Sequence, residues 1–214
     1  MENSIALLCD IGNTSYFFQD AKGRMFKESV ASFDPSSVKE KVYYISVNSA
    51  LEETLASLEN WVNLHSFVER ENYYETMGID RICVVEAVEN GVIIDAGSAI
   101  TVDVVRDGIF EGGFIYPGVK AMQETYKGIS PALHYEFNFS LNLAVLPKNS
   151  QDAISYGYLK GFYEEVKRHH LPIIVTGGDA PKMKKLFPQA ELESGLIFKG
   201  MQKILERKHN LISF

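Results

Sequence analysis

Short apolar runs that end in an acidic turn occur twice along the chain. Residues 5–9 are apolar and lead into Asp10-Ile11-Gly12-Asn13-Thr14, and residues 92–94 are apolar and lead into Asp95-Ala96-Gly97-Ser98-Ala99. Each turn is followed by further strand-forming residues, near 15–19 and 100–106. The hydrophobic pattern therefore predicts two strand-turn-strand units of the same kind.

In the first half, the pattern predicts a meander of strands within residues 4–32, with turns at 10–14 and 20–23, and a further strand at 42–47. Ser49 and Glu52 match a capping box with Ser49 at the N-cap. We expect a helix there, with Leu51, Leu55, Leu58 and Val62 on one apolar stripe. The apolar run at 81–86 predicts a short strand.

The second half repeats this order. Strands are predicted at 92–95, 100–106 and 109–114, followed by a helix at 119–126, a long helix with Ser150 as its N-cap, a buried strand at 172–175 and a last helix at 194–208. A meander followed by alternating helix and strand, found twice, predicts an α/β duplication. We therefore expect two domains, residues 1–90 and 91–214.

Composition narrows the class of protein. The chain has 214 residues, 46% of them hydrophobic and 23% charged, which is typical of globular proteins. Its net charge of -7 and the lack of a basic cluster disfavour nucleic acid as a partner. No apolar run reaches the roughly 20 residues of a membrane helix, so we expect a cytoplasmic protein without a membrane partner. Cys9 and Cys83 lie in apolar runs and are expected to be buried thiols.

The turn after Asp10 has the composition of a phosphate-binding loop. Gly12 permits the positive φ that lets a backbone curl around a phosphate, while Asn13, Thr14 and Ser15 add donors. Asp10 could hold a hydrated magnesium ion. A plain β-turn also favours these residue types, but two such turns at equivalent places favour phosphate binding.

The sequence Gly78-Ile79-Asp80-Arg81 follows a tyrosine-rich loop and precedes an apolar run. Asp80 could accept a proton from an attacking hydroxyl, and Arg81 could bind an anionic group. The alternative is a surface ion pair of little consequence.

A third turn, Thr176-Gly177-Gly178-Asp179, follows the predicted strand at 172–175. Its paired glycines leave room for a flat ring against the backbone, although a plain helix-entry turn has the same composition. Neither Gly-x-x-x-x-Gly-Lys-Ser/Thr nor Gly-x-Gly-x-x-Gly occurs, so a nucleotide site here is of another kind. The five histidines lack metal-binding spacing and are expected at the surface.

Together these motifs resemble those of the type III pantothenate kinases, within the superfamily of actin-like and hexokinase-like ATPases. The matches occur in the family's order and span most of the chain: Asp10-x-Gly-Asn-Thr, Gly78-x-Asp-Arg, Asp95-x-Gly-Ser-Ala-x-Thr, Gly112-Gly-x-Ile-x-Pro-Gly118 and Thr176-Gly-Gly-Asp179. The resemblance implies two RNase H-like domains with the active site in the cleft between them, usually in a homodimer. It also implies ATP, Mg²⁺ and a monovalent cation, K⁺ or NH₄⁺.

The resemblance further assigns roles to residues of this chain. The ATP phosphates would be held by Asp10, Ile11, Gly12, Asn13, Thr14, Ser15, Tyr16 and Phe17, with Ser98 also on ATP and Gly177 and Gly178 beside the adenosine. Pantothenate would be bound by Gly78, Ile79, Asp80 and Arg81, and by Ser150 of the partner subunit. Asp80 would be the proton acceptor, Asp95 would face the monovalent cation, and Asp10 would reach Mg²⁺ through water.

Two positions depart from the family pattern. Ser98 replaces the usual threonine of the second turn and keeps the hydroxyl. The usual Tyr-x-x-Pro before Gly-x-Asp-Arg is absent, with Glu71 at the expected tyrosine position, so we expect Tyr74 to supply that contact.

The implied activity is ATP-dependent phosphorylation of pantothenate to 4'-phosphopantothenate, the first step of coenzyme A biosynthesis. A kinase or phosphatase for another small molecule, or a non-enzymatic accessory protein of the same fold that affects transcription, would share the two phosphate turns. A filament-forming actin relative is disfavoured, because the chain is too short for the additional subdomains.

Overall fold

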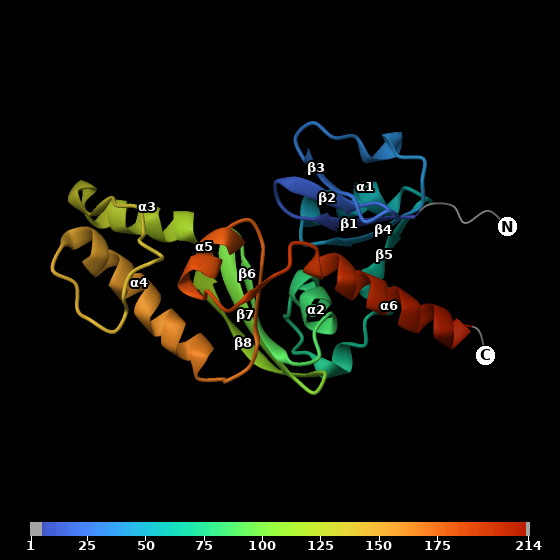
Figure 1. The fold of residues 1–214 in the computed structure, drawn as a ribbon. Coiled ribbons are helices and arrows are strands. Elements are labelled where there is room, and N and C mark those ends of the chain that lie inside the picture. Colours follow the sequence, from blue (N-terminus) through green and yellow to red (C-terminus); the bar gives the residue numbers. More distant parts are fainter. Residues whose placement is uncertain (1–5, 213–214) are drawn as a thin grey trace. The chain divides into compact units, whose positions relative to one another are not determined.

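The structure, a computed structural model, describes residues 6–212 of the chain and the side chains of residues 6–208 (Figure 1). Residues 4 and 5 of the predicted first meander lie outside the described part. The chain forms two compact units: the first contains the residues up to Val88 and those from Gly195 on, and the second is Glu89–Ser194. The last helix, which the sequence analysis placed with the second half, thus packs with the first unit.

The first unit contains a mixed sheet of five strands. These are β1 (Leu7–Ile11), β2 (Ser15–Gln19), β3 (Met25–Ser29), β4 (Val42–Ser46) and β5 (Trp61–Asn63), in the order β3-β2-β1-β4-β5. The meander β1-β2-β3 is antiparallel, whereas β4 is parallel to β1 and β5 is parallel to β4.

The second unit contains a sheet of the same design. Its strands are β6 (Gly91–Ala96), β7 (Ala99–Arg106), β8 (Ile109–Pro117), β9 (Ile173–Thr176) and β10 (Glu191–Leu192), in the order β10-β9-β6-β7-β8. The meander β6-β7-β8 is antiparallel, and β9 and β10 run parallel to β6. Strand order and direction match those of the first sheet one for one, so the predicted α/β duplication is confirmed. Asp10 and Asp95 are each the penultimate residue of the first strand of their sheet.

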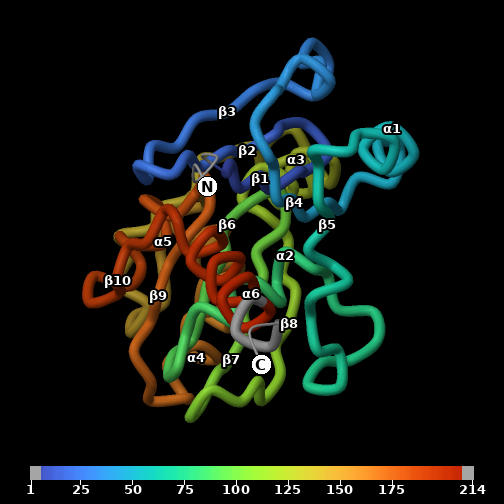
Figure 2. The backbone as a smooth tube through the Cα atoms, turned by 90° about the vertical axis from the view of Figure 1, so that its right-hand side faces the viewer, coloured from blue at the N-terminus to red at the C-terminus, as the bar shows by residue number. Residues whose placement is uncertain are grey.

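Helices of the first unit are α1 (Glu52–Ala56), α2 (Ile79–Glu86) and α6 (Leu196–Ile212), with short 3₁₀ turns at Pro35–Ser37, Ser49–Leu51, Leu64–Phe67 and Arg70–Asn72. α2 and α6 lie side by side (Figures 1 and 2). Their approach is so close that a Cβ atom on Gly200 would stand 1.7 Å from the carbonyl oxygen of Cys83. Glycine is therefore required where the two helices cross.

The second unit contains α3 (Val119–Ile129), α4 (Ser150–Lys167) and α5 (Ala180–Leu186), with a 3₁₀ turn at Pro131–Leu133. α4 buries an apolar stripe of Ile154, Tyr158, Phe162 and Val166 against the sheet. Within the described part of the chain, no helix is both long enough and apolar enough to cross a bilayer.

The predicted helix after Ser49 is wrong in its start and its length. Asn48 is the cap, since its side chain accepts a hydrogen bond from the backbone N–H of Ala50. The α-helix ends at Ala56, and Val62 lies in β5. The chain turns away because the backbone N–H of Trp61 bonds to the carbonyl of Leu58.

The predicted strand at 81–86 is a helix, α2. Five consecutive residues, 81–85, are buried, and a short apolar run that is buried on all sides does not distinguish a strand from a helix. The N-cap of α4 is Asn149 and not Ser150, because the Asn149 side chain accepts a hydrogen bond from the N–H of Asp152.

Candidate active site

The first acidic turn is a tight hairpin between β1 and β2. The N–H of Gly12 donates to the carbonyl of Ser15 at 3.0 Å, and Asn13 and Thr14 are exposed at the tip. Gly12 does not adopt the positive φ that a glycine permits, since it is not among the glycines that have one. A Cβ there would meet only the Ser15 carbonyl, at 3.8 Å. The fold itself therefore does not require glycine at this position.

Not every residue of this hairpin has its side chain available to a ligand. Ile11 and Tyr16 are buried, and Tyr16 packs among Phe18, Phe33 and Trp61. Their backbone groups alone could contact a phosphate. Asp10 is half-buried and pairs with Phe17 across the hairpin.

The second group of predicted site residues begins α2. Gly78 is the N-cap, and the Asp80 carboxylate in the first turn accepts a hydrogen bond from the N–H of Arg81 at 2.9 Å. A Cβ on Gly78 would stand 2.4 Å from Asp80 Oδ1, so glycine lets this carboxylate fold back over the helix start. The positive end of the helix dipole favours a carboxylate there.

Arg81 is held close to Tyr74. Its side chain is buried, its guanidinium donates to the Tyr74 hydroxyl, and the guanidinium carbon lies 5.7 Å from the centroid of the Tyr74 ring. The structure thus joins the arginine of the Gly-x-Asp-Arg motif to the tyrosine that the sequence analysis put in place of the missing family residue.

Asp10 and Asp80 both lie near the buried Cys83. Burial raises the pKa of the Cys83 thiol well above its ordinary value, and the nearby carboxylates of Asp10 and Asp80 raise it further. Cys9 is buried as well, and both cysteines are free thiols, as predicted. Asp10 of β1 and Asp80 of α2 thus both lie near Cys83 although 70 positions separate them in the sequence.

In the second unit, Asp95 is surrounded by the third turn. It pairs with Thr101 of β7 and Thr176 of β9. Gly177 has φ +89°, and a Cβ there would stand 2.4 Å from Asp95 Oδ1 and 2.6 Å from the carbonyl oxygen of Ala96. The N–H of Asp179 donates to that same carbonyl at 2.8 Å. Glycine is thus needed at residue 177 for two reasons: the positive φ, and the close approach of the backbone to Asp95, which leaves no room for a Cβ.

The glycine that ends the Gly-Gly-x-Ile-x-Pro-Gly motif closes the other side of this cluster. A Cβ on Gly118 would stand 2.1 Å from the carbonyl oxygen of Ser98 and 2.8 Å from that of Gly97. The Tyr158 hydroxyl of α4 donates to the carbonyl of Pro117 at 2.6 Å and holds the motif in place. Three motifs that are distant in sequence therefore meet at Asp95–Ser98 of the second unit. Ser98 itself is exposed.

The contacts around Ser150 involve none of these turns. It is exposed at the first position of α4, where Asn149 and Asp152 bond to each other. Sequence reasoning missed Asn48, which lies just after β4 and whose side-chain amide donates to the carbonyl of Gly12 at 3.5 Å and so supports the first hairpin. The sequence feature that could have pointed to Asn48 is an asparagine directly after a predicted strand.

The described residues contain no group of three or more His, Cys, Asp or Glu side chains arranged to hold a metal. The donors present nevertheless fit the implied ions. Mg²⁺ keeps several waters and needs one or two carboxylates beside a phosphate, which Asp10 offers. Beside Gly177, an Asp95 carboxylate oxygen and the Ala96 carbonyl oxygen lie close together, and oxygen donors of this kind suit a monovalent cation.

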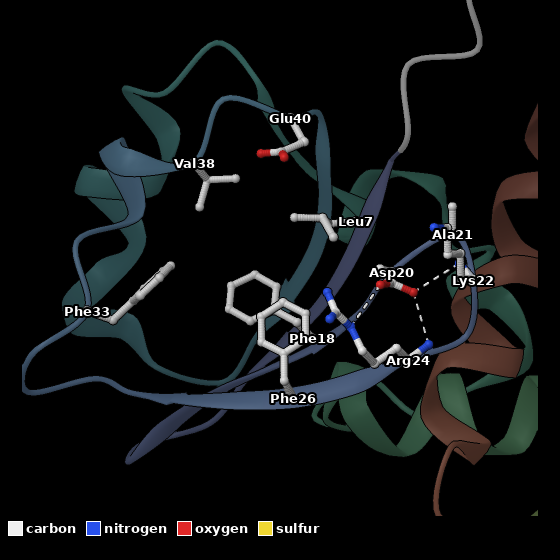
Figure 3. A pocket seen from close by; sticks show the side chains of 10 residues that line it. All are labelled: Leu7, Phe18, Asp20, Ala21, Lys22, Arg24, Phe26, Phe33, Val38 and Glu40. Atoms are coloured by element: carbon white, nitrogen blue, oxygen red, sulfur yellow. Dashed lines mark hydrogen bonds and ion pairs between the residues drawn. The ribbon is translucent and has the colours of Figure 1, made fainter.

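A pocket of about 640 Å³ opens elsewhere in the first unit (Figure 3). Its wall is apolar, with Phe18 and Phe26 stacked at 5.1 Å, and the Asp20–Arg24 ion pair lies at its rim. Phe18 and Phe17 point to opposite faces of β2, and Phe17 contacts Phe198 of α6. The pocket thus lies on the sheet face away from α6, and no predicted site residue lines it.

Comparison with known proteins decides the family. The model of the family described as "Type III pantothenate kinase" matches residues 35–171. A curated type III pantothenate kinase from Sulfurimonas denitrificans is 54% identical over 201 residues, which cover 94% of this chain and 98% of the relative. The chain belongs to the type III pantothenate kinase family.

Solved structures agree with this family and its fold. A Campylobacter jejuni protein described as a Baf family transcriptional activator is 38% identical, with a TM-score of 0.83 and coverage of 95% of this chain and 99% of that chain. MreB5 of Spiroplasma citri bound to ADP shares the fold alone, at 9% identity and a TM-score of 0.52, with 100% and 99% coverage. The duplicated, actin-like ATPase fold predicted from the sequence is therefore confirmed.

Proposed function

We propose that the protein transfers the γ-phosphoryl group of ATP to the primary hydroxyl of pantothenate and so makes 4'-phosphopantothenate. One observation carries the proposal: each sheet presents an aspartate at the same topological position, followed by a tight turn, in a chain of the type III pantothenate kinase family. The proposal requires both turns to act on one triphosphate.

The first hairpin is assigned to the ATP phosphates. Its tip is exposed, and nothing in the fold demands a glycine at residue 12. Space for a phosphate against the backbone is a physical reason for that residue. Asn13, Thr14 and Ser15 add donors, and Asp10 would hold a hydrated Mg²⁺.

Asp80 is assigned to the reacting hydroxyl. Phosphoryl transfer has a loose transition state in which positioning and charge stabilisation supply most of the catalysis. A carboxylate fixed at the start of α2 can orient the hydroxyl and accept its proton as the bond to phosphorus forms. Arg81, fixed by Tyr74, would bind the pantothenate carboxylate through its planar pair of donors.

The second unit is assigned to the nucleotide. Ser98 would contact ATP, Gly177 and Gly178 would lie against the adenosine, and Asp95 would face K⁺ or NH₄⁺. These ions, when bound, supply positive charge beside the phosphates. A homodimer in which Ser150 reaches the pantothenate of the partner subunit, and a cytoplasmic location, belong to the same proposal.

The test is ADP release in a coupled assay with pantothenate as acceptor, against glucose, acetate, polyphosphate and no acceptor, in potassium and in sodium buffer. We expect release that depends on pantothenate and is faster in potassium. Equal release with another acceptor, or with none, would contradict the proposed substrate.

A second candidate is favoured by the name of the Campylobacter jejuni structure, a transcriptional activator. A regulator of that kind would bind ATP and release no ADP with pantothenate in potassium buffer. The same assay, combined with a nucleotide-binding measurement, separates the two candidates.

A further inference from the structure

Two adjacent tyrosines tie one loop to both ends of α2. The Tyr73 hydroxyl donates to Glu86 Oε1 at 2.9 Å, in the last turn of the helix. The Tyr74 hydroxyl accepts from Arg81, in the first turn. The backbone at Tyr73 is extended, with φ -133° and ψ 151°, so successive side chains point to different sides of the chain. Fixing the Tyr73 ring therefore also fixes the direction in which Tyr74 leaves the loop.

Glu86 is in an unfavourable place for a carboxylate. It lies at the negative end of the helix dipole, and its side chain is only 8% exposed. Arg207 of α6 compensates for the helix dipole and for the burial of the charge. Its guanidinium donates two hydrogen bonds to the Glu86 carboxylate, Nη2 to Oε2 at 2.5 Å and Nη1 to Oε1 at 3.2 Å. Lys203, also from α6, reaches the carbonyl of Ala87 just beyond the helix end. The last helix of the chain thus holds the acceptor on which Tyr73 is anchored.

The loop between Tyr73 and α2 is ordered by its own hydrogen bonds. The N–H of Tyr73 donates to the carbonyl of Arg70, and the N–H of Met77 donates to that of Tyr74, both at 3.0 Å. The Arg70 guanidinium donates to the carbonyls of Glu75 and Met77 at 3.2 and 3.3 Å. The loop therefore behaves as a short rigid piece whose orientation is set where it is attached, at Tyr73 and at Gly78.

We propose that Tyr73, Glu86 and Arg207 form a positioning network that sets the geometry of the substrate-binding pair Tyr74 and Arg81. The inference rests on the proposed function, because that function makes this pair a pantothenate contact. None of the three network residues needs to touch substrate; they act through the direction of the loop. Their removal is expected to weaken the binding of pantothenate and to leave the chemical step and the ATP site unchanged.

The test compares Tyr73→Phe with Tyr135→Phe, a matched loss of one hydroxyl at a partly exposed tyrosine of the second unit. Tyr73→Phe is expected to raise the KM for pantothenate about tenfold, the scale of one hydrogen bond to a charged group, with kcat and the KM for ATP within about twofold. Tyr135→Phe is expected to match wild type. A KM for pantothenate equal to that of Tyr135→Phe, or a loss confined to kcat, would overturn the inference.

A second variant tests the route through Glu86. Glu86→Gln keeps an acceptor for Tyr73 but loses the charge that Arg207 binds, so it too is expected to raise the KM for pantothenate. Residues that act as one unit are not additive, and the double variant with Tyr73→Phe is expected to be no worse than the worse single one. If the increases in the KM for pantothenate of the two single variants multiply in the double variant, Tyr73 does not act through Glu86.

Hydrogen exchange supplies a readout that does not depend on activity. In Tyr73→Phe, the amide of Met77 and its loop neighbours are expected to exchange faster than in wild type, with α4 unchanged. Unaltered exchange at Met77 would overturn the network even if wild type failed to phosphorylate pantothenate. A wild-type protein that does not phosphorylate pantothenate would contradict the proposed function and not the network.

Discussion

Gly177→Ala is the substitution whose cost the structure defines most closely. The position has φ +89°, where a residue with a Cβ is strained by about 1–2 kcal/mol. The new Cβ would also stand 2.4 Å from Asp95 Oδ1 and 2.6 Å from the Ala96 carbonyl oxygen, inside the 3.0 Å that real contacts avoid. Forced displacement of packed atoms adds about 1–3 kcal/mol. We expect a loss of roughly 2–5 kcal/mol in the free energy of unfolding.

The neighbouring residue supplies the control. Gly178 has an ordinary φ, and a Cβ there would meet nothing within 4 Å. Gly178→Ala is expected to unfold like wild type, whereas Gly177→Ala is expected to lower Tm by roughly 2–4 °C for each kcal/mol. Urea unfolding and thermal unfolding, each followed by circular dichroism, measure the free energy of unfolding and the Tm of the two variants. Equal stability of the two variants would refute the assigned packing of the turn on Asp95. A raised KM for ATP in the folded Gly178→Ala variant would support the proposed adenosine contact.

Three further changes have defined outcomes. Arg81→Lys keeps the charge and loses the planar fork, so the KM for pantothenate should rise roughly tenfold; an unchanged KM would remove Arg81 from the substrate site. Gly200→Ala places a Cβ 1.7 Å from the Cys83 carbonyl oxygen, so the urea midpoint should fall, and a wild-type midpoint would contradict the packing of α2 on α6. Two asparagine side chains hold the pKa of Asp152 below its usual value, which adds stability that is lost as pH falls through the folded-state pKa. The stability gap between wild type and Asp152→Asn should therefore shrink below about pH 4, and a constant gap would refute the linkage.

The strands of both meanders are short apolar or alternating runs bounded by turn residues, and these were predicted closely. The segment after Met77 was not, because residues 81–85 are all buried and show neither a two-residue nor a 3.6-residue period. The helix after Ser49 failed for a different reason. Asn48, one residue earlier, outcompetes Ser49 as the cap, and the turn at Leu58–Trp61 ends the apolar stripe.

The individual turns of the candidate site were visible in the sequence, but their packing was not. Nothing in the spacing shows that Gly177 and Gly118 both contact the Asp95–Ser98 segment, since the first contact depends on the pairing of β9 with β6 and the second on the pairing of β8 with β7. Gly12 permits a positive φ but does not adopt one, because turn composition does not determine φ. Glu86 and Arg207 are 121 positions apart, and no local pattern connects them.

The most direct measurement is product formation by purified protein from ATP and pantothenate, followed by mass spectrometry, for wild type and Asp80→Asn. The account predicts equal amounts of ADP and 4'-phosphopantothenate from wild type. It also predicts a rate at least about tenfold lower for Asp80→Asn, with an unchanged Tm. Absence of the phosphorylated product from wild type, or an Asp80→Asn variant as fast as wild type, would contradict it.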